Sequence, residues 1–356
     1  MVRTLFSVKS FSGSSNPYVR LLVESLPTDV VATPFSWRTA LLGPYDVLHV
    51  HWPEYLFRSR RGARRVVKSA LALGLITRII IRRTPVVLTV HNLRPHETGS
   101  SIEALLAQWL ERLTDIRIYL NESEENDLAR GVVVLHAAYP ERPRADEERD
   151  AARKILFFGQ LRPYKGLEDL LAAFREVSDG ELVIAGAAAV PEYAYDIERV
   201  VTADERVELR IGHLSDDELA ELLHSSDLVT LPYKYLYNSG AAVMALGAGK
   251  TILVPSSGST RALAREVGGE WVSLFDAPLA AADLEAGLAS AASHGGSDRP
   301  NLSKRESSLV GNLHAAVYEA LLAAGRGGPG RSRRRADALR RIRADRRFRE
   351  HSELNR

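Results

Sequence analysis

The stretch "ILFFGQLRPYKGLEDLLAAF", Ile155–Phe174, joins a short apolar run to a pattern of helical period through a glycine-bearing turn. This succession is typical of one strand–helix step in a parallel α/β sheet. Arg162 and Lys165 stand in the turn, and Gly166 comes just before the helix. Ligands bind such sheets at the carboxyl ends of the strands, where helix amides and nearby cations attract phosphate. The stretch therefore predicts an anion site, and an ordinary solvated turn is the alternative.

A second stretch of the same kind is "DLVTLPYKYLYNSGAAVMALGAGKTILVP", Asp227–Pro255. A buried strand is followed by a tyrosine-rich loop, and Asn238, Ser239 and Gly240 precede a helix of small residues. Ser239 is a candidate N-cap, which would leave amides at the helix start available to an anion. The alternative is a capped helix with no ligand. Two such sites at equivalent strand ends of one domain favour the anion site.

Short β-branched runs alternate with helical patterns along the chain, and this alternation predicts an α/β fold of parallel sheets with helices on both faces. Twelve runs are strand candidates: 3–8, 29–32, 46–51, 85–90, 116–120 and 132–135 in the first half, and 154–158, 182–185, 207–211, 228–231, 251–254 and 271–274 in the second. The charged stretch "YPERPRADEERDAAR" separates the two series and reads as a linker.

The sequence thus predicts two doubly wound, Rossmann-like domains that face each other across a cleft. The expected boundaries are 1–140 for the first domain, 141–153 for the linker, 154–303 for the second domain, 304–324 for a C-terminal helix and 325–356 for a basic flexible tail. The alternative for the tail is a helix with Leu339, Ile342 and Phe348 on one side. The tail holds twelve arginines against four acidic residues, whereas the rest has 35 basic against 41 acidic residues. The net charge of +2 therefore hides a strongly basic end.

The composition indicates a globular protein, with 45% apolar and 26% charged residues in a chain of 356. Cysteine is absent, which excludes disulfides and thiolate metal sites. The N-terminus shows no signal-peptide pattern, and the longest apolar run is interrupted by Arg78. We expect a cytoplasmic protein. The segment 58–83 is basic at both ends and apolar in the middle, so its rim could also contact an anionic membrane.

Polar side chains follow several strand candidates of the first half. The stretch "VLHVHWPEYLF" places His51 and Glu54 after one strand, and "VVLTVHNLRPHE" places His91 and Glu97 after another. The first loop, "FSGSSNPYV", contributes two further candidates, Gly13 and Asn16. Polar groups past apolar strands line the cleft in this architecture. A core histidine and an exposed loop acid are the alternatives for His91 and Glu97. No spacing of histidines and carboxylates supports a metal site.

The two stretches of the second half together resemble the nucleotide-sugar-binding domain of GT-B glycosyltransferases. In that group a G-x-L-x-x-x-K-G loop contacts the donor diphosphate, and here it reads "GQLRPYKG", with Arg162 and Lys165 at its two cationic positions. The resemblance covers most of 154–254. Many retaining members carry a second glutamate early in the next helix, where this chain has Met244. The pattern "NSGAAVMALGAGK" looks more like a bacterial group that includes mannosyltransferases of exopolysaccharide assembly.

The resemblance implies a glycosyltransferase that moves a hexose, with mannose as the guess, from a nucleoside-diphosphate sugar to a saccharide or lipid-linked saccharide. Arg162, Lys165, Gly166 and the start of the helix at Ser239 would bind the diphosphate. By position His91 matches a histidine that contacts the donor sugar in related enzymes, and Glu97 is a candidate general base. No cofactor or metal is expected, and a lipid-linked acceptor implies peripheral contact with the inner face of the cell membrane.

Two other functions stay open. A sugar-nucleotide epimerase could use the same cleft and would turn over its substrate without an acceptor. A non-catalytic nucleic-acid-binding protein is suggested by the Arg-rich tail, and it predicts salt-sensitive polynucleotide binding that is lost on truncation at Arg326.

Overall fold

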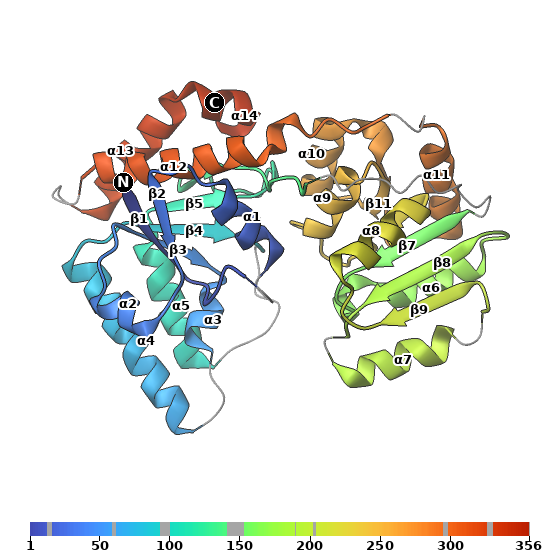
Figure 1. The fold of residues 1–356 in the computed structure, drawn as a ribbon, viewed down its shortest axis with the longest axis horizontal. Helices are drawn as coiled ribbons and strands as arrows, with labels where there is room; N and C mark the ends of the chain where they lie inside the picture. Colours follow the sequence, from blue (N-terminus) through green and yellow to red (C-terminus); the bar gives the residue numbers. More distant parts are fainter. Residues whose placement is uncertain are drawn as a thin grey trace. The chain divides into compact units, whose positions relative to one another are not determined.

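The structure is a computed structural model that describes residues 1–12, 16–58, 62–92, 100–140, 153–188, 190–201, 204–294, 298–325 and 330–355. The chain divides into two compact units. Unit 1 consists of Met1–Ala137 and Lys304–Arg356, and unit 2 is the intervening Ala138–Ser303. Each unit is built on its own six-stranded sheet, with helices on both faces (Figure 1).

Unit 1 holds a parallel sheet in the order β2-β1-β3-β4-β5-β6. The strands are β1 (Val2–Phe6), β2 (Val30–Thr33), β3 (Val47–His51), β4 (Val86–Val90), β5 (Ile116–Tyr119) and β6 (Gly131–Val133). Every residue of the central β3 is buried, as expected for a parallel strand covered on both faces.

The helices of unit 1 form two layers. One face of the sheet carries α2 (Trp37–Leu42), α3 (Pro53–Phe57), α4 (Ala63–Ile81) and α5 (Ser101–Leu113), whose apolar sides share one core with β1, β3 and β4. Next, α1 (Pro17–Ser25) packs against α12 (Ser307–Ala323), which in turn packs against α13 (Arg331–Ala344). A short α14 (Arg346–His351) follows, and the chain closes with the 3-10 turn Glu353–Asn355.

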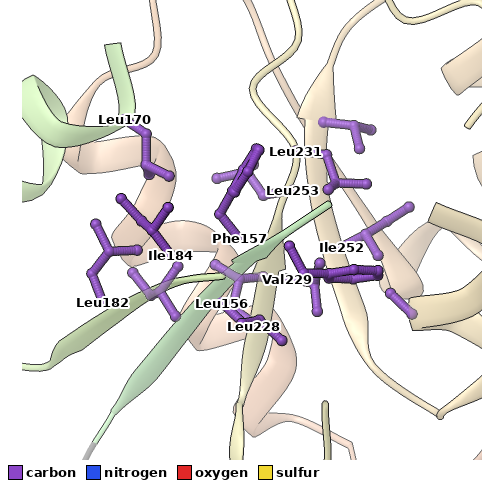
Figure 2. Close-up of a cluster of buried hydrophobic side chains, with 14 of the residues drawn as sticks. Leu156, Phe157, Leu170, Leu182, Ile184, Leu228, Val229, Leu231, Ile252 and Leu253 are labelled. Atoms are coloured by element: carbon purple, nitrogen blue, oxygen red, sulfur yellow. The ribbon is translucent and has the colours of Figure 1, made fainter. Parts of the chain in front are cut away.

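Unit 2 repeats this architecture in the order β12-β11-β10-β7-β8-β9. Its strands are β7 (Lys154–Phe158), β8 (Glu181–Gly186), β9 (Val207–Ile211), β10 (Leu228–Thr230), β11 (Thr251–Pro255) and β12 (Val272–Phe275). Its helices are α6 (Leu167–Arg175), α7 (Pro191–Val201), α8 (Asp216–Ser225), α9 (Gly240–Gly247), α10 (Gly258–Val267) and α11 (Ala281–Ala292). Figure 2 shows part of the buried core, in which residues of β7, β8, β10 and β11 meet Leu170 of α6.

The strand order fixes where each sheet can bind a ligand. In unit 2 the chain runs from β7 outward through β8 and β9, and then returns to the other side of β7 with β10. In unit 1 the same reversal separates β1 from β3. Adjacent crossovers leave in opposite directions at these points, and this opens a crevice beyond the carboxyl ends of the two strands. The loops after β7 and β10, and those after β1 and β3, are therefore the places where a site is expected.

The sequence predicted all twelve strands of the described chain to within two residues at each end, and the doubly wound α/β class is confirmed. The strands are short runs rich in apolar and β-branched residues, which is a strong local signal.

The C-terminal segment differs from the predicted flexible tail. Over its described residues it forms α13 and α14 and belongs to unit 1. Arg334 is buried and donates two hydrogen bonds of 2.8 Å to the carboxylate of Asp115, which also accepts one of 2.9 Å from Arg331. Ala338, Leu339, Ile342 and Phe348 are buried on the same segment. The helical alternative with Leu339, Ile342 and Phe348 on one side is therefore the correct one, and the partner of Arg334 lies 219 residues away in sequence.

The last described residues also complete the sheet of unit 1. The side-chain amide of Asn355 donates to the carbonyl of Val133 at 2.8 Å and accepts from the Val133 N–H at 2.8 Å. Val133 belongs to β6, the edge strand, whose backbone groups need partners. Nearby, His351 Nε2 accepts from the N–H of Leu135 at 2.9 Å. The side chains of Asn355 and His351 therefore form hydrogen bonds with this part of the chain that a neighbouring strand would otherwise form.

Candidate active site

The loop after β7 folds back over the end of its own strand. Gly159 has φ +116°, and a Cβ atom there would lie 3.0 Å from the Lys165 ammonium, so the lysine passes directly over this glycine. The next strand approaches as closely, because a Cβ on Gly186 would lie 2.0 Å from the Gly159 carbonyl oxygen. Leu161 then forms an isolated bridge to Ala188. Glycine is required at position 159 by its positive φ and at position 186 by the close approach of the Gly159 backbone.

Lys165 is the most unusual side chain of this loop. It is 8% exposed, and its ammonium donates to the hydroxyl of Tyr233 at 3.1 Å and lies 4.7 Å from the centre of that ring. Among the described residues it has no carboxylate partner. Burial lowers the pKa of Lys165 to about 8, and the charge of Arg162 acts in the same direction. A buried cation without a counter-ion is costly unless a ligand supplies the negative charge.

The loop after β10 is docked against the first loop. Gly166 has φ +68°, and a Cβ there would lie 2.1 Å from the Pro232 carbonyl oxygen, so no side chain fits. The N–H of Lys234 donates to the carbonyl of Tyr164 at 2.9 Å. These two contacts hold the loops that follow β7 and β10 side by side across the strand reversal.

The loop after β10 ends at the start of α9. Ser239 is the N-cap, and its hydroxyl accepts from the N–H of Ala242 at 3.2 Å. Its side chain also interacts with the Tyr233 hydroxyl, and this interaction partly offsets the rise in the pKa of Tyr233 caused by burial. Asn238 and Gly240 flank the cap and are half-buried. The start of α9, with its positive end of the helix dipole, is thus linked through Tyr233 to the Lys165 ammonium.

The predicted diphosphate-binding residues of unit 2 therefore come together. Arg162 precedes the 3-10 turn Pro163–Lys165 and its Nε donates to Gln160 at 3.1 Å on the exposed side of the loop. One buried cation, one half-buried guanidinium and one capped helix start meet at the reversal of strand order. This combination is suited to a doubly charged oxyanion group, since charge, fork geometry and backbone amides are all present.

Unit 1 presents a different chemistry at its own reversal. His51 ends β3 and His91 follows β4, and the two are joined by a hydrogen bond of 3.0 Å between Nδ1 of His51 and Nε2 of His91. Ser7, just after β1, donates to the His51 carbonyl at 2.8 Å. The indole of Trp52 stacks on the His91 ring with centroids 3.8 Å apart. Trp52 has φ +46°, an uncommon conformation for a residue with a side chain.

The His51–His91 pair is part of a larger group that we call the histidine cluster: His49, His51, His91, His136 and His314. All five are buried. Burial lowers the pKa of His51 to about 3 and the pKa values of His136 and His314 to about 4, and it lowers the pKa of His91 well below its usual range. The rings are therefore neutral at pH 7 and offer hydrogen bonds rather than charge.

The other predicted residues of unit 1 are placed only in part. Asn16 caps α1, where its side chain accepts from the N–H of Tyr18 at 3.0 Å. Glu54 lies in the first turn of α3 and is half-buried. Gly13 and Glu97 lie outside the described residues. The assignment of Glu97 as general base and the placement of both residue sets around one cleft stay predictions.

Some residues of the two sites were not predicted from the sequence. Tyr233 was visible only as part of a tyrosine-rich loop, and no spacing rule connects it to a lysine 68 residues earlier. His49 and His314 read as ordinary core positions, yet His49 bonds both Tyr318, at 2.7 Å, and Thr89, at 2.8 Å. Within the described ranges no group of three or more ligating side chains could hold a metal ion. None of the described helices is long and apolar enough to cross a membrane.

Two doubly wound units, each on a parallel six-stranded sheet with flanking helices, are typical of the GT-B class of fold. Solved structures share it: sucrose-phosphate synthase (tll1590) from Thermosynechococcus elongatus has a TM-score of 0.63 at 15% identity and covers 91% of this chain and 99% of its own. AviGT4, a glycosyltransferase involved in avilamycin A biosynthesis, has a TM-score of 0.57 at 16% identity and covers 91% and 99%. At these identities the similarity is one of fold.

Sequence comparison identifies the family. The profile described as "Glycosyl transferases group 1" matches residues 152–291, which span most of unit 2. A "GDP-mannose:glycolipid 4-beta-D-mannosyltransferase" of Xanthomonas campestris pv. campestris is 36% identical over 320 residues, covering 89% of this chain and 92% of the relative. An "Uncharacterized glycosyltransferase" of Methanocaldococcus jannaschii is 31% identical over 35% of the chain. The chain belongs to the GT-B glycosyltransferases, as predicted.

Proposed function

We propose that this glycosyltransferase transfers mannose from GDP-mannose to a lipid-linked saccharide. The observation that carries the proposal is the buried Lys165 ammonium, which has no carboxylate partner among the described residues and lies at the reversal of strand order in unit 2. The choice of donor and acceptor is supported by the relative of 36% identity, whose name gives GDP-mannose and a glycolipid.

The site supports a leaving-group mechanism. When the bond from the sugar to the diphosphate breaks, negative charge develops on the departing phosphate oxygen. Lys165, Arg162 and the amides at the start of α9 would bind and neutralise that charge. The neutral His91 would hydrogen-bond the donor sugar, and Glu97 would take the proton from the acceptor hydroxyl. Met244, in the middle of α9, offers a ribose hydroxyl only a thioether, which is a weak acceptor compared with a carboxylate. The nucleoside is therefore recognised by other residues.

Isothermal titration calorimetry with GDP, UDP, dTDP and ADP tests the donor. We expect GDP to bind most tightly, and Arg162→Ala to weaken its binding by about tenfold, the effect of one lost charge-assisted contact. Arg265→Ala is the matched control, because this exposed arginine lies in the last turn of α10, away from the carboxyl edge of the sheet. If no nucleoside diphosphate binds the wild-type protein, the donor site is refuted.

The acceptor proposal also draws on an exposed surface of unit 1, which we call the two-helix surface. It consists of eight apolar side chains on α4 and α5, each between 41% and 73% exposed: Val66, Val67, Leu73, Ile80, Ile81, Ile102, Leu105 and Trp109. The two helices pack against each other on one face of the sheet. Val66, Leu73 and Ile80 recur at intervals of seven residues, which sets them along one side of α4.

Charge favours an anionic partner for this surface. The segment 58–96 contains ten lysines and arginines and no acidic residue. Arg64 near one end of α4 and Arg82 just after its other end are exposed. Apolar side chains between cations bind the interface of a bilayer with anionic lipids, which are enriched in the cytoplasmic leaflet. The proposal therefore includes peripheral attachment at the inner face of the membrane, where a lipid-linked acceptor is reached.

Vesicle co-sedimentation tests the attachment. We expect binding to vesicles of phosphatidylglycerol and phosphatidylcholine, and about tenfold less to phosphatidylcholine alone. Leu73→Glu with Ile80→Glu should abolish binding, whereas Tyr195→Glu, an exposed aromatic on α7 of unit 2, should not change it. If the double variant sediments with vesicles as much as the wild type does, the two-helix surface does not bind the membrane. If the wild type self-associates and does not bind vesicles, the surface is instead an interface with a second copy.

A further inference from the structure

We propose that Tyr233 is a positioning residue for donor binding, whose hydroxyl fixes the Lys165 ammonium and the start of α9 at one separation. The inference rests on the proposed donor site and adds a residue to it. Tyr233 contacts the two anion-binding parts of unit 2, which come from different loops and are 74 positions apart in sequence between Lys165 and Ser239.

The hydrogen-bond directions define the bridge. The Lys165 ammonium has only donors, so the Tyr233 oxygen accepts at 3.1 Å. The Tyr233 hydroxyl also interacts with the Ser239 side chain, which partly offsets the rise in its pKa caused by burial. The Ser239 oxygen accepts from the N–H of Ala242 at 3.2 Å. The phenol therefore interacts both with the ammonium and with the residue that caps α9.

Packing leaves Tyr233 little freedom. The residue is 7% exposed, and its ring makes edge contacts with Phe157 of β7 at 6.4 Å and with Tyr164 at 6.2 Å between centroids. On either side, Pro232 is held against Gly166, and the N–H of Lys234 bonds the Tyr164 carbonyl. Because Tyr233 is held in place by these contacts, it restricts the Lys165 ammonium to which it is hydrogen-bonded. This restriction lowers the entropic cost of ordering Lys165 when the ligand binds.

The bridge also affects the charge of Lys165. Three groups act on its ammonium: Tyr233 through the hydrogen bond, Tyr164, which favours the charged form, and Arg162, which disfavours it. Burial is the largest influence and lowers the pKa of Lys165 to about 8. Diphosphate binding requires the ammonium, so affinity should fall as the pH rises through about 8. Without the tyrosine hydroxyl the buried ammonium loses its acceptor, and the fall should begin at lower pH.

The test is GDP affinity measured by calorimetry from about pH 7 to about pH 9. For Tyr233→Phe, which keeps the ring, we expect about tenfold weaker binding at neutral pH and an alkaline midpoint lowered by about one unit. Ser239→Ala should weaken binding without moving the midpoint, because the contact between Lys165 and Tyr233 persists. Lys165→Ala should remove the alkaline fall, which assigns it to this lysine. Tyr235→Phe, 80% exposed in the same loop, is the control and should match wild type.

The possible outcomes distinguish a wrong role for Tyr233 from a wrong donor site. If wild type binds GDP and Tyr233→Phe keeps both the affinity and the midpoint of wild type, the positioning role is rejected while the donor site stands. A lowered melting temperature with unchanged affinity and midpoint also rejects it, since a purely structural tyrosine would behave that way. If wild type binds no nucleoside diphosphate, the proposed function itself fails.

Discussion

The two units share a topology and differ in what they place at the reversal of strand order. In unit 2 that position holds a buried ammonium, a half-buried guanidinium and a capped helix start. In unit 1 it holds His51 and His91, two neutral rings bonded to each other at 3.0 Å. The same topology thus carries a cationic group of side chains in unit 2 and an uncharged group in unit 1. The comparison indicates that the topology sets where a site can lie. The side chains at the strand ends then set which part of a reaction that site can carry out.

The largest predicted effect is a difference between the two units in their loss of stability at low pH. The histidine cluster of unit 1 has pKa values lowered by burial, to about 3 for His51 and about 4 for His136 and His314. The unfolded chain takes up protons below about pH 6.5 whereas the folded chain does not, so stability is lost as the pH falls. Each such histidine should cost about 2 kcal/mol of unfolding free energy between about pH 7 and about pH 5.

Urea unfolding followed by amide exchange measures this loss for each unit. Unit 1 should unfold first on acidification, and His314→Gln should reduce its pH dependence by about one proton. An equal acid response in the two units would show that the cluster does not set the stability of unit 1.

The buried ion pair of the C-terminal segment gives the next effect. Arg334→Ala leaves the Asp115 carboxylate buried with less compensation, and we expect a loss of about 3 to 5 kcal/mol in the stability of unit 1. Arg340→Ala, which removes an exposed arginine of the same helix, should cost less than about 1 kcal/mol. Thermal and urea denaturation measure both variants. GDP affinity at a temperature where both are folded should match wild type, and a lost affinity in Arg334→Ala would contradict the separation of the units.

The smallest of the three effects concerns ligand binding alone. Lys165→Ala should weaken GDP binding by about 2 kcal/mol, the value of a charge-assisted hydrogen bond, and Lys234→Ala in the neighbouring exposed loop should change it little. His91→Ala should leave GDP affinity unchanged and lower the rate of sugar transfer. Calorimetry and a transfer assay with GDP-mannose separate these outcomes. If His91→Ala lost as much GDP affinity as Lys165→Ala, the assignment of diphosphate binding to the cationic site of unit 2 alone would be wrong.

The strands and the loop cations were predictable because their signals are local. An apolar run that ends in glycine, followed by Arg162 and Lys165 before a helix, is readable within about ten residues. Ser239 was predictable for the same reason, since a serine before a run of small residues is a capping signal.

Contacts between distant residues were not predictable in this way. The carboxylate of Asp115 accounts for Arg334, and the edge of β6 accounts for Asn355, yet neither partner is close in sequence. A count of twelve arginines suggested a solvated tail, because charge is visible in a sequence and its compensation is not. Tyr233 was overlooked for the same reason, since its importance depends on two loops that meet only in the folded sheet.

The side-chain pairing of Asn355 with β6 has a consequence for biosynthesis. Unit 2 is one uninterrupted segment, Ala138–Ser303, so all of its residues are made before residues 304–356 of unit 1. Unit 1 begins to emerge earlier, but the contacts of Asp115 with Arg334 and of β6 with Asn355 cannot form until residues 330–355 have been made. Until then the edge of β6 lacks these partners, and open strand edges favour aggregation.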